Sequence, residues 1–243
     1  MDKYGLIGKN IDYSFSKKFF SEKFQSEKIQ AEYINFDIDE ITDFPKILRS
    51  EKKLKGLNVT IPYKEKIIPF LSEITSEAKK IGAVNTIDFR NGKTIGYNTD
   101  AFGFVEALRP YLKKKTQKAL ILGSGGASKA VAFGLKSLNI PFKIVSRKPS
   151  ETFISYKMLS KKIIQQHSII INCTPLGTFP NAEQCPEIPY SLLEKNHLLF
   201  DLTYNPPLSL FLKNGLLQGA EIENGQKMLE FQAKKAWQIW NTP

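Results

Sequence analysis

The stretch QKALILGSGGASKAVAFGLKSL, residues 117–138, decides the fold class of this 243-residue chain. It reads as a short apolar strand, a glycine-rich turn and a helix. Residues 141–147, PFKIVSR, follow as a second strand, so that about 30 residues form a strand–helix–strand unit. This order predicts an α/β fold with a parallel sheet and helices on both of its faces.

Downstream segments extend the same pattern. Residues 168–175 and 198–204 are apolar enough to be buried strands. Residues 225–240 form an amphipathic helix whose apolar side chains fall near one face. These side chains are Met228, Leu229, Ala233, Ala236, Trp237 and Trp240.

The first 100 residues alternate strand and helix signals and suggest a second domain. We expect strands at 4–8, 33–36 and 57–61, a helix that Ser16 caps and that runs to about 29, and helices at 41–49 and at 76–81. Residues 83–89 and 94–98 flank Asn91-Gly92, a strong hairpin signal. We expect an N-terminal α/β substrate domain, 1–100 completed by the helix 226–243, and a Rossmann-type doubly wound domain, 101–225. The boundary should lie in the helix 101–112.

Composition narrows the class of protein. A hydrophobic content of 42% and a charged content of 24% are those of an ordinary globular chain. No apolar run approaches the ~20 residues of a membrane span, the first residues lack a signal-peptide core, and two cysteines make no disulfide framework. We therefore expect a cytoplasmic protein that does not bind membranes.

The net charge of +11 favours anionic partners of small size. Lysines occur in short groups with acidic residues scattered among them, and no long basic arm or aromatic–basic stripe appears. This pattern argues against nucleic-acid binding. The alternative is an ordinary lysine-rich solvated surface.

The glycine-rich turn after residues 119–122 predicts a dinucleotide site. Glycines let a backbone approach a pyrophosphate, and the following helix N-terminus attracts its charge. Serine replaces the third glycine of the usual fingerprint, although the strand–turn–helix–strand context supports the assignment. The alternative is a structural tight turn. The predicted cofactor loop comprises Gly123, Ser124, Gly125, Gly126, Ala127 and Ser128.

The second strand of this unit ends in Ser146-Arg147-Lys148. An NAD-selective site would place an acidic residue near here, to bind the ribose 2′-hydroxyl. Arginine and lysine instead suit a 2′-phosphate, which Arg147 can bind bidentately. We therefore expect NADP rather than NAD, with a solvated basic turn as the alternative.

The run GLNVTIPYK, residues 56–64, carries the clearest catalytic signal. Val59 and Ile61 should enter a core, with Asn58 and Thr60 on the opposite face. The strand should stop at Pro62, which places Lys64 at its lip beside a cleft, where a lysine can take part in proton transfer. The alternative is an exposed lysine after a strand end.

Three polar clusters accompany this run. Ser14 and Ser16 flank Phe15 and could face one side of an extended segment. Asn85 lies within GAVNT, and Asp100 closes Asn98-Thr99-Asp100. Each has an ordinary structural explanation, and Asp100 before a helix is by itself most simply an N-cap.

Together, in this order, the motifs closely resemble the shikimate dehydrogenase family over nearly the whole chain. They are Ser-x-Ser, NVTIPYK, GAVNT, glycine then NTD, GSGGAS, NxTPxG (172–177), DLTYNPP (201–207) and Met228 through Gln232-Ala233. The resemblance implies NADPH-dependent, reversible reduction of 3-dehydroshikimate to shikimate in aromatic amino-acid biosynthesis. It also implies a small-molecule substrate. Ketone reduction by a nicotinamide cofactor requires no metal, and we expect a monomer or homodimer.

The resemblance assigns roles residue by residue. Lys64 and Asp100 resemble the catalytic pair. The implied substrate ligands are Ser14, Ser16, Asn58, Thr60, Asn85, Tyr204 and Gln232. Besides the glycine loop and residues 146–148, the implied cofactor neighbours are Thr174, Leu202, Gly225 and Met228, largely near the nicotinamide.

Some positions depart from the family pattern. Lys17 replaces the usual proline after Ser-x-Ser, Ser-Arg-Lys replaces Asn-Arg-Thr, and GQK replaces GLG before Met228. Two alternatives therefore stay open: a quinate/shikimate dehydrogenase using NAD, and a non-catalytic NADP-binding regulatory protein. His167 and His197 lie outside the motifs and are interpreted as structural or surface residues.

Overall fold

The structure, a computed structural model, describes residues 1–11, 14–112, 117–148, 150–179 and 181–242. Position 243, the end of the expected segment 226–243, lies outside the described residues. The chain forms two compact units, Met1–Phe102 with Gln232–Pro243, and Gly103–Phe231. None of the described helices has the length and apolar character needed to cross a membrane.

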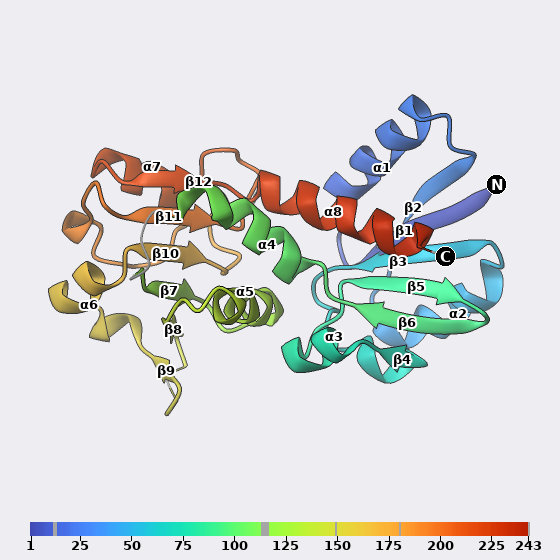
Figure 1. The fold of residues 1–243 in the computed structure, drawn as a ribbon, viewed down its shortest axis with the longest axis horizontal. Helices are drawn as coiled ribbons and strands as arrows, with labels where there is room; N and C mark the ends of the chain where they lie inside the picture. Colours follow the sequence, from blue (N-terminus) through green and yellow to red (C-terminus); the bar gives the residue numbers. More distant parts are fainter. Residues whose placement is uncertain (12–13, 113–116, 149, 180, 243) are drawn as a thin grey trace. The chain divides into compact units, whose positions relative to one another are not determined.

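The first unit is built on a mixed sheet with the strand order β2-β1-β3-β5-β6-β4 (Figure 1). β1 pairs in parallel with β2 and β3, whereas β5 runs antiparallel to β3 and β6. Asn91 and Gly92 have φ angles of 52° and 74°, which confirms the expected hairpin turn. The strands are β1 Asp2–Gly8, β2 Ala31–Asp37, β3 Leu54–Val59, β4 Glu73–Ile74, β5 Thr86–Arg90 and β6 Lys93–Tyr97.

Helices cover both faces of this sheet. Leu57 and Val59 pack in one apolar cluster with α2 (Phe44–Ser50) and α3 (Ser76–Ile81). Tyr4 and Leu6 pack in another with α1 (Phe15–Ser26) and the end of α8 (Gln226–Asn241). Short 3-10 turns lie at η1 Ile41–Asp43 and η2 Ile68–Phe70.

The contact between Gly56 and Trp240 shows how the C-terminal segment completes this unit. A side-chain carbon added at Gly56 would lie 2.3 Å from the indole ring of Trp240. The indole Nε1 donates a hydrogen bond to the carbonyl of Ile87 at 3.0 Å. Only a glycine at this strand position therefore lets the ring reach the sheet.

Two local expectations are wrong. β3 ends at Val59, and a turn in which the Tyr63 N–H donates to the Thr60 carbonyl leads Ile61 out of the core, so that it is 68% exposed. Ser14, not Ser16, caps α1, with its hydroxyl accepting from the Lys17 N–H at 3.2 Å. Ser14 and Ser16 are thus a cap and a first-turn residue rather than parts of one extended segment. A proline at position 17 could not donate this bond.

The second unit is a doubly wound domain of the Rossmann type, as expected from the sequence. Its strand order is β12-β11-β10-β7-β8-β9, and the pairs between its described strands are all parallel (Figure 1). The strands are β7 Ala119–Leu122, β8 Phe142–Val145, β9 Phe153–Ile154, β10 Ile169–Asn172, β11 Leu198–Asp201 and β12 Glu221–Glu223.

Alternate side chains of β7 face opposite layers of helices. Ile121 packs with residues of α4 (Asp100–Leu108) and α5 (Gly126–Ser137). Leu120 and Leu122 pack with α6 (Lys161–Gln166) and α7 (Leu210–Leu217). The remaining turns of 3-10 type are η3 Arg109–Tyr111, η4 Tyr156–Met158 and η5 Tyr190–Leu192.

Candidate active site

Lys64 lies in the turn that follows β3, and its neighbours hold its backbone. Tyr63 is buried, and its hydroxyl donates to the carbonyl of Ile38 at 2.7 Å. The Val84 N–H donates to the carbonyl of Lys64 at 2.8 Å. The lysine side chain therefore starts from an anchored backbone.

Asp100 is the first residue of α4, but it does not serve as the cap that its position suggested. The Ala101 N–H donates to Asn98 Oδ1 at 3.2 Å, and Asn98 Nδ2 donates to the carbonyl of Ala83 at 3.0 Å. Because Asn98 supplies the capping oxygen, the carboxylate of Asp100 is left to bind side chains.

Lys64 and Asp100 form an ion pair at the centre of the site. Lys64 Nζ lies 2.6 Å from Asp100 Oδ2, and the two side chains are only 17% and 9% exposed. Asn85 Nδ2 donates to the other oxygen, Oδ1, at 2.9 Å. A half-buried ammonium beside a carboxylate can polarise a carbonyl oxygen and deliver a proton to it.

Two predicted substrate ligands meet at this pair. Asn85 Nδ2 lies 3.3 Å from Gln232 Oε1, although 147 residues separate them in the chain. Thr99, which sequence reasoning did not select, contributes its hydroxyl 3.0 Å from Asn85 Nδ2 and 3.3 Å from Gln232 Oε1. In the sequence, its position between Asn98 and Asp100 was the signal that could have indicated a place in the site.

The other predicted substrate ligands occupy different settings. Ser16 is buried in the first turn of α1, and Thr60 is half-buried just beyond β3. Asn58 is only 3% exposed and donates to Thr86 Oγ1 and to the carbonyl of Asn85. Tyr204 follows β11 and belongs to the second unit, whereas the other predicted substrate ligands belong to the first.

The predicted cofactor loop joins β7 to α5 and has the local geometry that a dinucleotide requires. Gly123 has a φ of 106°, and an added side-chain carbon would lie 3.1 Å from Thr174 Cγ2, so that glycine is needed there. At Gly125, an added carbon would meet no atom of the described residues within 4 Å. Open space in front of a helix N-terminus fits a pyrophosphate.

Serine side chains brace this loop. Ser128, in place of the third glycine, is buried, and its hydroxyl donates to the carbonyl of Gly125 at 2.6 Å. Ser124 and Ser146 have their hydroxyl oxygens 3.2 Å apart, which links the loop to the end of β8. The exposed Arg147 and Lys148 follow directly. Two cations beside the predicted cofactor loop fit the 2′-phosphate expected from the sequence.

The predicted nicotinamide neighbours also belong to the second unit. Gly225 precedes α8, and an added side-chain carbon would lie 2.2 Å from the carbonyl oxygen of Leu202. Met228 is buried in the same helix. Thr174 Oγ1 donates to Asn172 Oδ1 at 2.7 Å. These contacts hold the ends of β10 and β11 and the start of α8 in close packing.

Asp201, at the end of β11, is a buried carboxyl that braces this region. Burial raises its pKa, and hydrogen bonds from Ser209, Thr203 and Asn172 oppose that rise. Asn172 Nδ2 donates to Asp201 Oδ1 at 3.0 Å. We interpret it as a structural group, since its oxygens are occupied by these protein donors.

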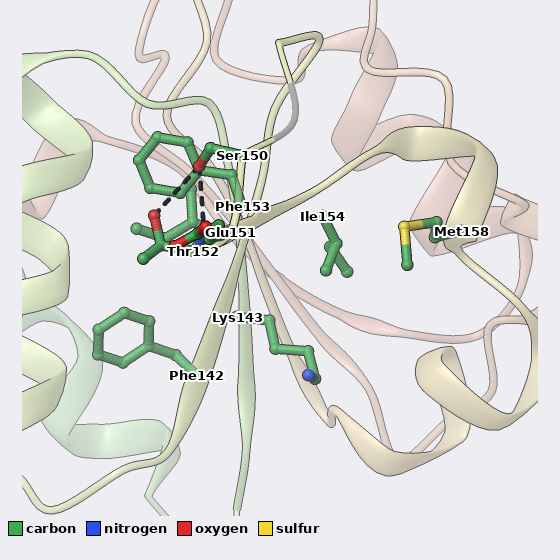
Figure 2. Close-up of a pocket in the computed structure, with 9 residues that line it drawn as sticks. Phe142, Lys143, Ser150, Glu151, Thr152, Phe153, Ile154 and Met158 are labelled. Carbon is green, nitrogen blue, oxygen red and sulfur yellow. Dashed lines mark hydrogen bonds between the residues drawn. The ribbon is translucent and has the colours of Figure 1, made fainter.

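A separate pocket of about 510 Å³ lies beside the short edge strand β9. Figure 2 shows Phe142 and Lys143 of β8 across from Phe153 and Ile154 of β9. The residues that line it include none of the predicted site residues. Among the described residues, no group of three or more His, Cys, Asp or Glu side chains could hold a metal ion.

Comparisons with known proteins match this arrangement. Residues 6–87 match the family described as the shikimate dehydrogenase substrate binding domain. "Shikimate dehydrogenase (NADP(+))" of Clostridium botulinum strain Hall is 41% identical over 247 residues, which cover 97% of this chain and 95% of that protein.

Solved structures show the same similarity. The shikimate 5-dehydrogenase of Thermus thermophilus in complex with NADP(H) and shikimate has a TM-score of 0.88 at 27% identity, covering 99% of this chain and 94% of that one. Quinate dehydrogenase from Corynebacterium glutamicum in complex with NAD has a TM-score of 0.86 at 25% identity, covering 99% and 93%.

Proposed function

This chain belongs to the shikimate dehydrogenase family and is an NADP-dependent oxidoreductase that reduces 3-dehydroshikimate reversibly to shikimate; on that premise we propose that Lys64 and Asp100 carry its proton transfer. The single observation behind this assignment is the half-buried ion pair, with Lys64 Nζ 2.6 Å from Asp100 Oδ2. The family resemblance read from the ordered motifs is confirmed.

The proposed chemistry divides between cofactor and protein. The bound cofactor supplies a hydride from C4 of its nicotinamide to the carbonyl carbon. The ammonium of Lys64 donates a hydrogen bond to the carbonyl oxygen and then its proton, which leaves a C–OH group. The carboxylate of Asp100 holds the ammonium in place and stabilises its charge before transfer. In the oxidation of shikimate, Lys64 accepts the proton.

We propose that the first unit, with the end of α8, binds the substrate. The substrate is a small ring with several hydroxyls and a carboxylate, and such a ligand needs many short hydrogen-bonding side chains. The ligands proposed within this unit are Ser14, Ser16, Thr60, Asn85 and Gln232.

We propose that the second unit binds NADP. The backbone around Gly125 and the N-terminus of α5 receive the pyrophosphate, and Arg147 with Lys148 receives the 2′-phosphate. Thr174, Leu202, Gly225 and Met228 neighbour the nicotinamide. Support comes from the open space at Gly125 and from the exposure of both cations.

Two alternatives are less well supported. One related structure is a quinate dehydrogenase in complex with NAD, but the basic pair after β8 in this chain favours the 2′-phosphate of NADP. A non-catalytic NADP-binding protein would not need a preorganised lysine–aspartate pair.

We further propose a cytoplasmic location and a monomeric or homodimeric state. Cys173 and Cys185 are both free thiols, as is usual in a reducing compartment. Cell fractionation and light scattering of the purified protein test these two points.

An absorbance assay at 340 nm tests the function. The purified protein is given shikimate or quinate with NADP or NAD, in four separate reactions. Reduction of NADP with shikimate, well above the other three combinations, is the expected result. A higher kcat/KM with quinate and NAD would replace the proposal by the quinate alternative, and no turnover in any reaction would favour the regulatory protein.

A further inference from the structure

We propose that Tyr33 and Asn58 are positioning residues, which hold Asn85 and through it the Lys64–Asp100 pair in one orientation. The inference rests on the proposed function of that pair. It is carried by a continuous series of hydrogen bonds within the first unit, which starts in β2 and ends at the catalytic carboxylate.

Tyr33 begins the series from inside the apolar core. Its ring is buried and stacks on Phe20, with centroids 4.8 Å apart and planes inclined by 10°. Its hydroxyl donates to Asn58 Oδ1 at 2.8 Å. Burial raises the pKa of Tyr33 well above its ordinary value, although a hydrogen bond with the Ser16 side chain opposes that rise, so the phenol keeps the proton that it donates.

Asn58 can adopt only one amide orientation. Its Nδ2 lies 3.3 Å from the backbone carbonyl of Asn85, and a carbonyl oxygen only accepts. Nδ2 must therefore face Asn85, which turns Oδ1 toward the hydroxyl of Tyr33. Nδ2 also donates to Thr86 Oγ1 at 3.2 Å. Each polar atom of the Asn58 amide thus has a protein partner.

Thr86 connects the fixed amide of Asn58 to the side chain of Asn85. Because its hydroxyl oxygen accepts from Asn58, its proton is available to Asn85 Oδ1 at 3.2 Å or to the Thr99 hydroxyl at 3.3 Å. Asn85 Oδ1 also accepts from the Thr99 N–H at 2.7 Å, and that group can only donate. Asn85 is therefore held with Nδ2 toward Asp100.

The orientation of the Asn85 amide determines which carboxylate oxygen of Asp100 remains for Lys64. Nδ2 binds Asp100 Oδ1 at 2.9 Å, which leaves Oδ2 to Lys64 at 2.6 Å. A reversed amide would turn its oxygen toward the carboxylate and repel it. The Thr99 N–H opposes that reversal directly, and the bonds from Tyr33 and Asn58 oppose it through the Thr86 hydroxyl. This places Asn58 behind the site, as a support for the reacting groups rather than a direct ligand of the substrate.

Tyr33→Phe is the sharpest test, because it removes one hydroxyl and keeps the ring stacked on Phe20. We expect kcat to fall about 3- to 10-fold, which is the effect of one neutral hydrogen bond. The Kd for NADP should change less than about twofold, since none of the proposed cofactor residues bonds the phenol. A change in the KM for shikimate would report the bond between Tyr33 and Ser16, a proposed substrate ligand, and does not decide the positioning role. Tyr190→Phe is the matched control, since its phenol donates to the carbonyl of Pro186 at 2.8 Å in the second unit.

A double-mutant cycle separates positioning from general loss of structure. In the Asp100→Asn background, Tyr33→Phe should cause little further loss of kcat, because the group that it positions is already altered. The same fractional loss in both backgrounds would overturn the proposal. So would an unchanged kcat in Tyr33→Phe alone, or an equal loss in Tyr190→Phe.

Thr86 provides an independent variant if Tyr33→Phe folds poorly. Thr86→Val breaks the series at its middle with little change of volume and should reproduce the loss of kcat, whereas Thr86→Ser keeps the hydroxyl and should restore it. Equal activity of the Val and Ser variants would contradict the inference. Wild-type turnover of shikimate is measured alongside. Its absence would reject the proposed function, whereas normal wild-type turnover with insensitive variants would reject only the positioning role.

Discussion

Lys64 Nζ lies 2.6 Å from Asp100 Oδ2, although 36 residues separate them along the chain. Lys64 comes from the turn after β3, and Asp100 is the first residue of α4. Both belong to the first unit, and Asn85 binds the remaining oxygen of the carboxylate. The ion pair is thus assembled by one sheet and the helix that leaves it.

Replacing either member of this pair should impair the chemical step. Lys64→Ala is expected to lower kcat by about 10² or more, because a positioned acid–base group contributes that much. Asp100→Asn should act similarly and also weaken shikimate binding. Steady-state kinetics at 340 nm measure both effects, with circular dichroism to confirm folding. The exposed Lys66 supplies the control Lys66→Ala, which should retain activity. Near-normal turnover of a folded Lys64→Ala would remove the lysine from the mechanism.

Arg147→Ala should change the choice of cofactor. Only NADP carries the 2′-phosphate, and a charge-assisted bidentate contact contributes about 1.5–3 kcal/mol. NADP binding should therefore weaken roughly 10- to 150-fold, with NAD binding little changed. Calorimetric titration with each cofactor measures this, and Lys143→Ala, at an exposed lysine of the preceding strand β8, is the control. An equal loss for both cofactors would identify Arg147 as structural.

Gly125 and Gly225 should respond differently to alanine. Gly125→Ala has room for its methyl group, so stability should stay within about 0.5 kcal/mol. The methyl would occupy the space proposed for the pyrophosphate, so NADP should bind about tenfold or more weakly, roughly 1.4 kcal/mol. Gly225→Ala would press its methyl against the Leu202 carbonyl at 2.2 Å and should destabilise the protein by about 1–3 kcal/mol. Chemical denaturation and cofactor titration distinguish them, and unchanged NADP affinity in Gly125→Ala would move the cofactor away from this loop.

His167 should make stability depend on pH. Burial lowers its pKa below the ordinary 6.5, the nearby Lys143 and Lys118 charges lower it further, and the Ile163 carbonyl bond opposes this. The unfolded chain therefore binds the proton more readily, so the stability present above pH 6.5 is lost as the pH falls through the lower folded value. Between about pH 7.5 and 5.5, an interval around the ordinary histidine pKa, the free energy of unfolding of His167→Gln should fall less than that of the wild type. Parallel pH profiles of urea denaturation for the two proteins would refute this.

Local signals in the sequence determined the fold class. The run 117–138 specifies strand, turn and helix by apolar period and by glycine, and the structure contains β7 and α5 there. Asn91-Gly92 specifies its hairpin because both residues tolerate positive φ. Such features depend on neighbours in the chain, so they could be predicted. The short strands β4, β9 and β12 and the helix α7 were not predicted, because their few residues carry too little periodicity.

The sequence also determined which residue types are available to the site, through motifs that place Lys64, Asn85 and Asp100 at strand ends and at a helix start. Tertiary structure alone decided their partners. Nothing in the chain near Tyr33 signals that its hydroxyl meets Asn58, and nothing near Gln232 signals that it lies 3.3 Å from Asn85. Ile61 reads as a core residue and is exposed, because the strand ends two residues earlier. Hydrogen bonds between distant segments depend on how the strands are ordered in the sheet, and that order is a property of the packed chain rather than of any local run.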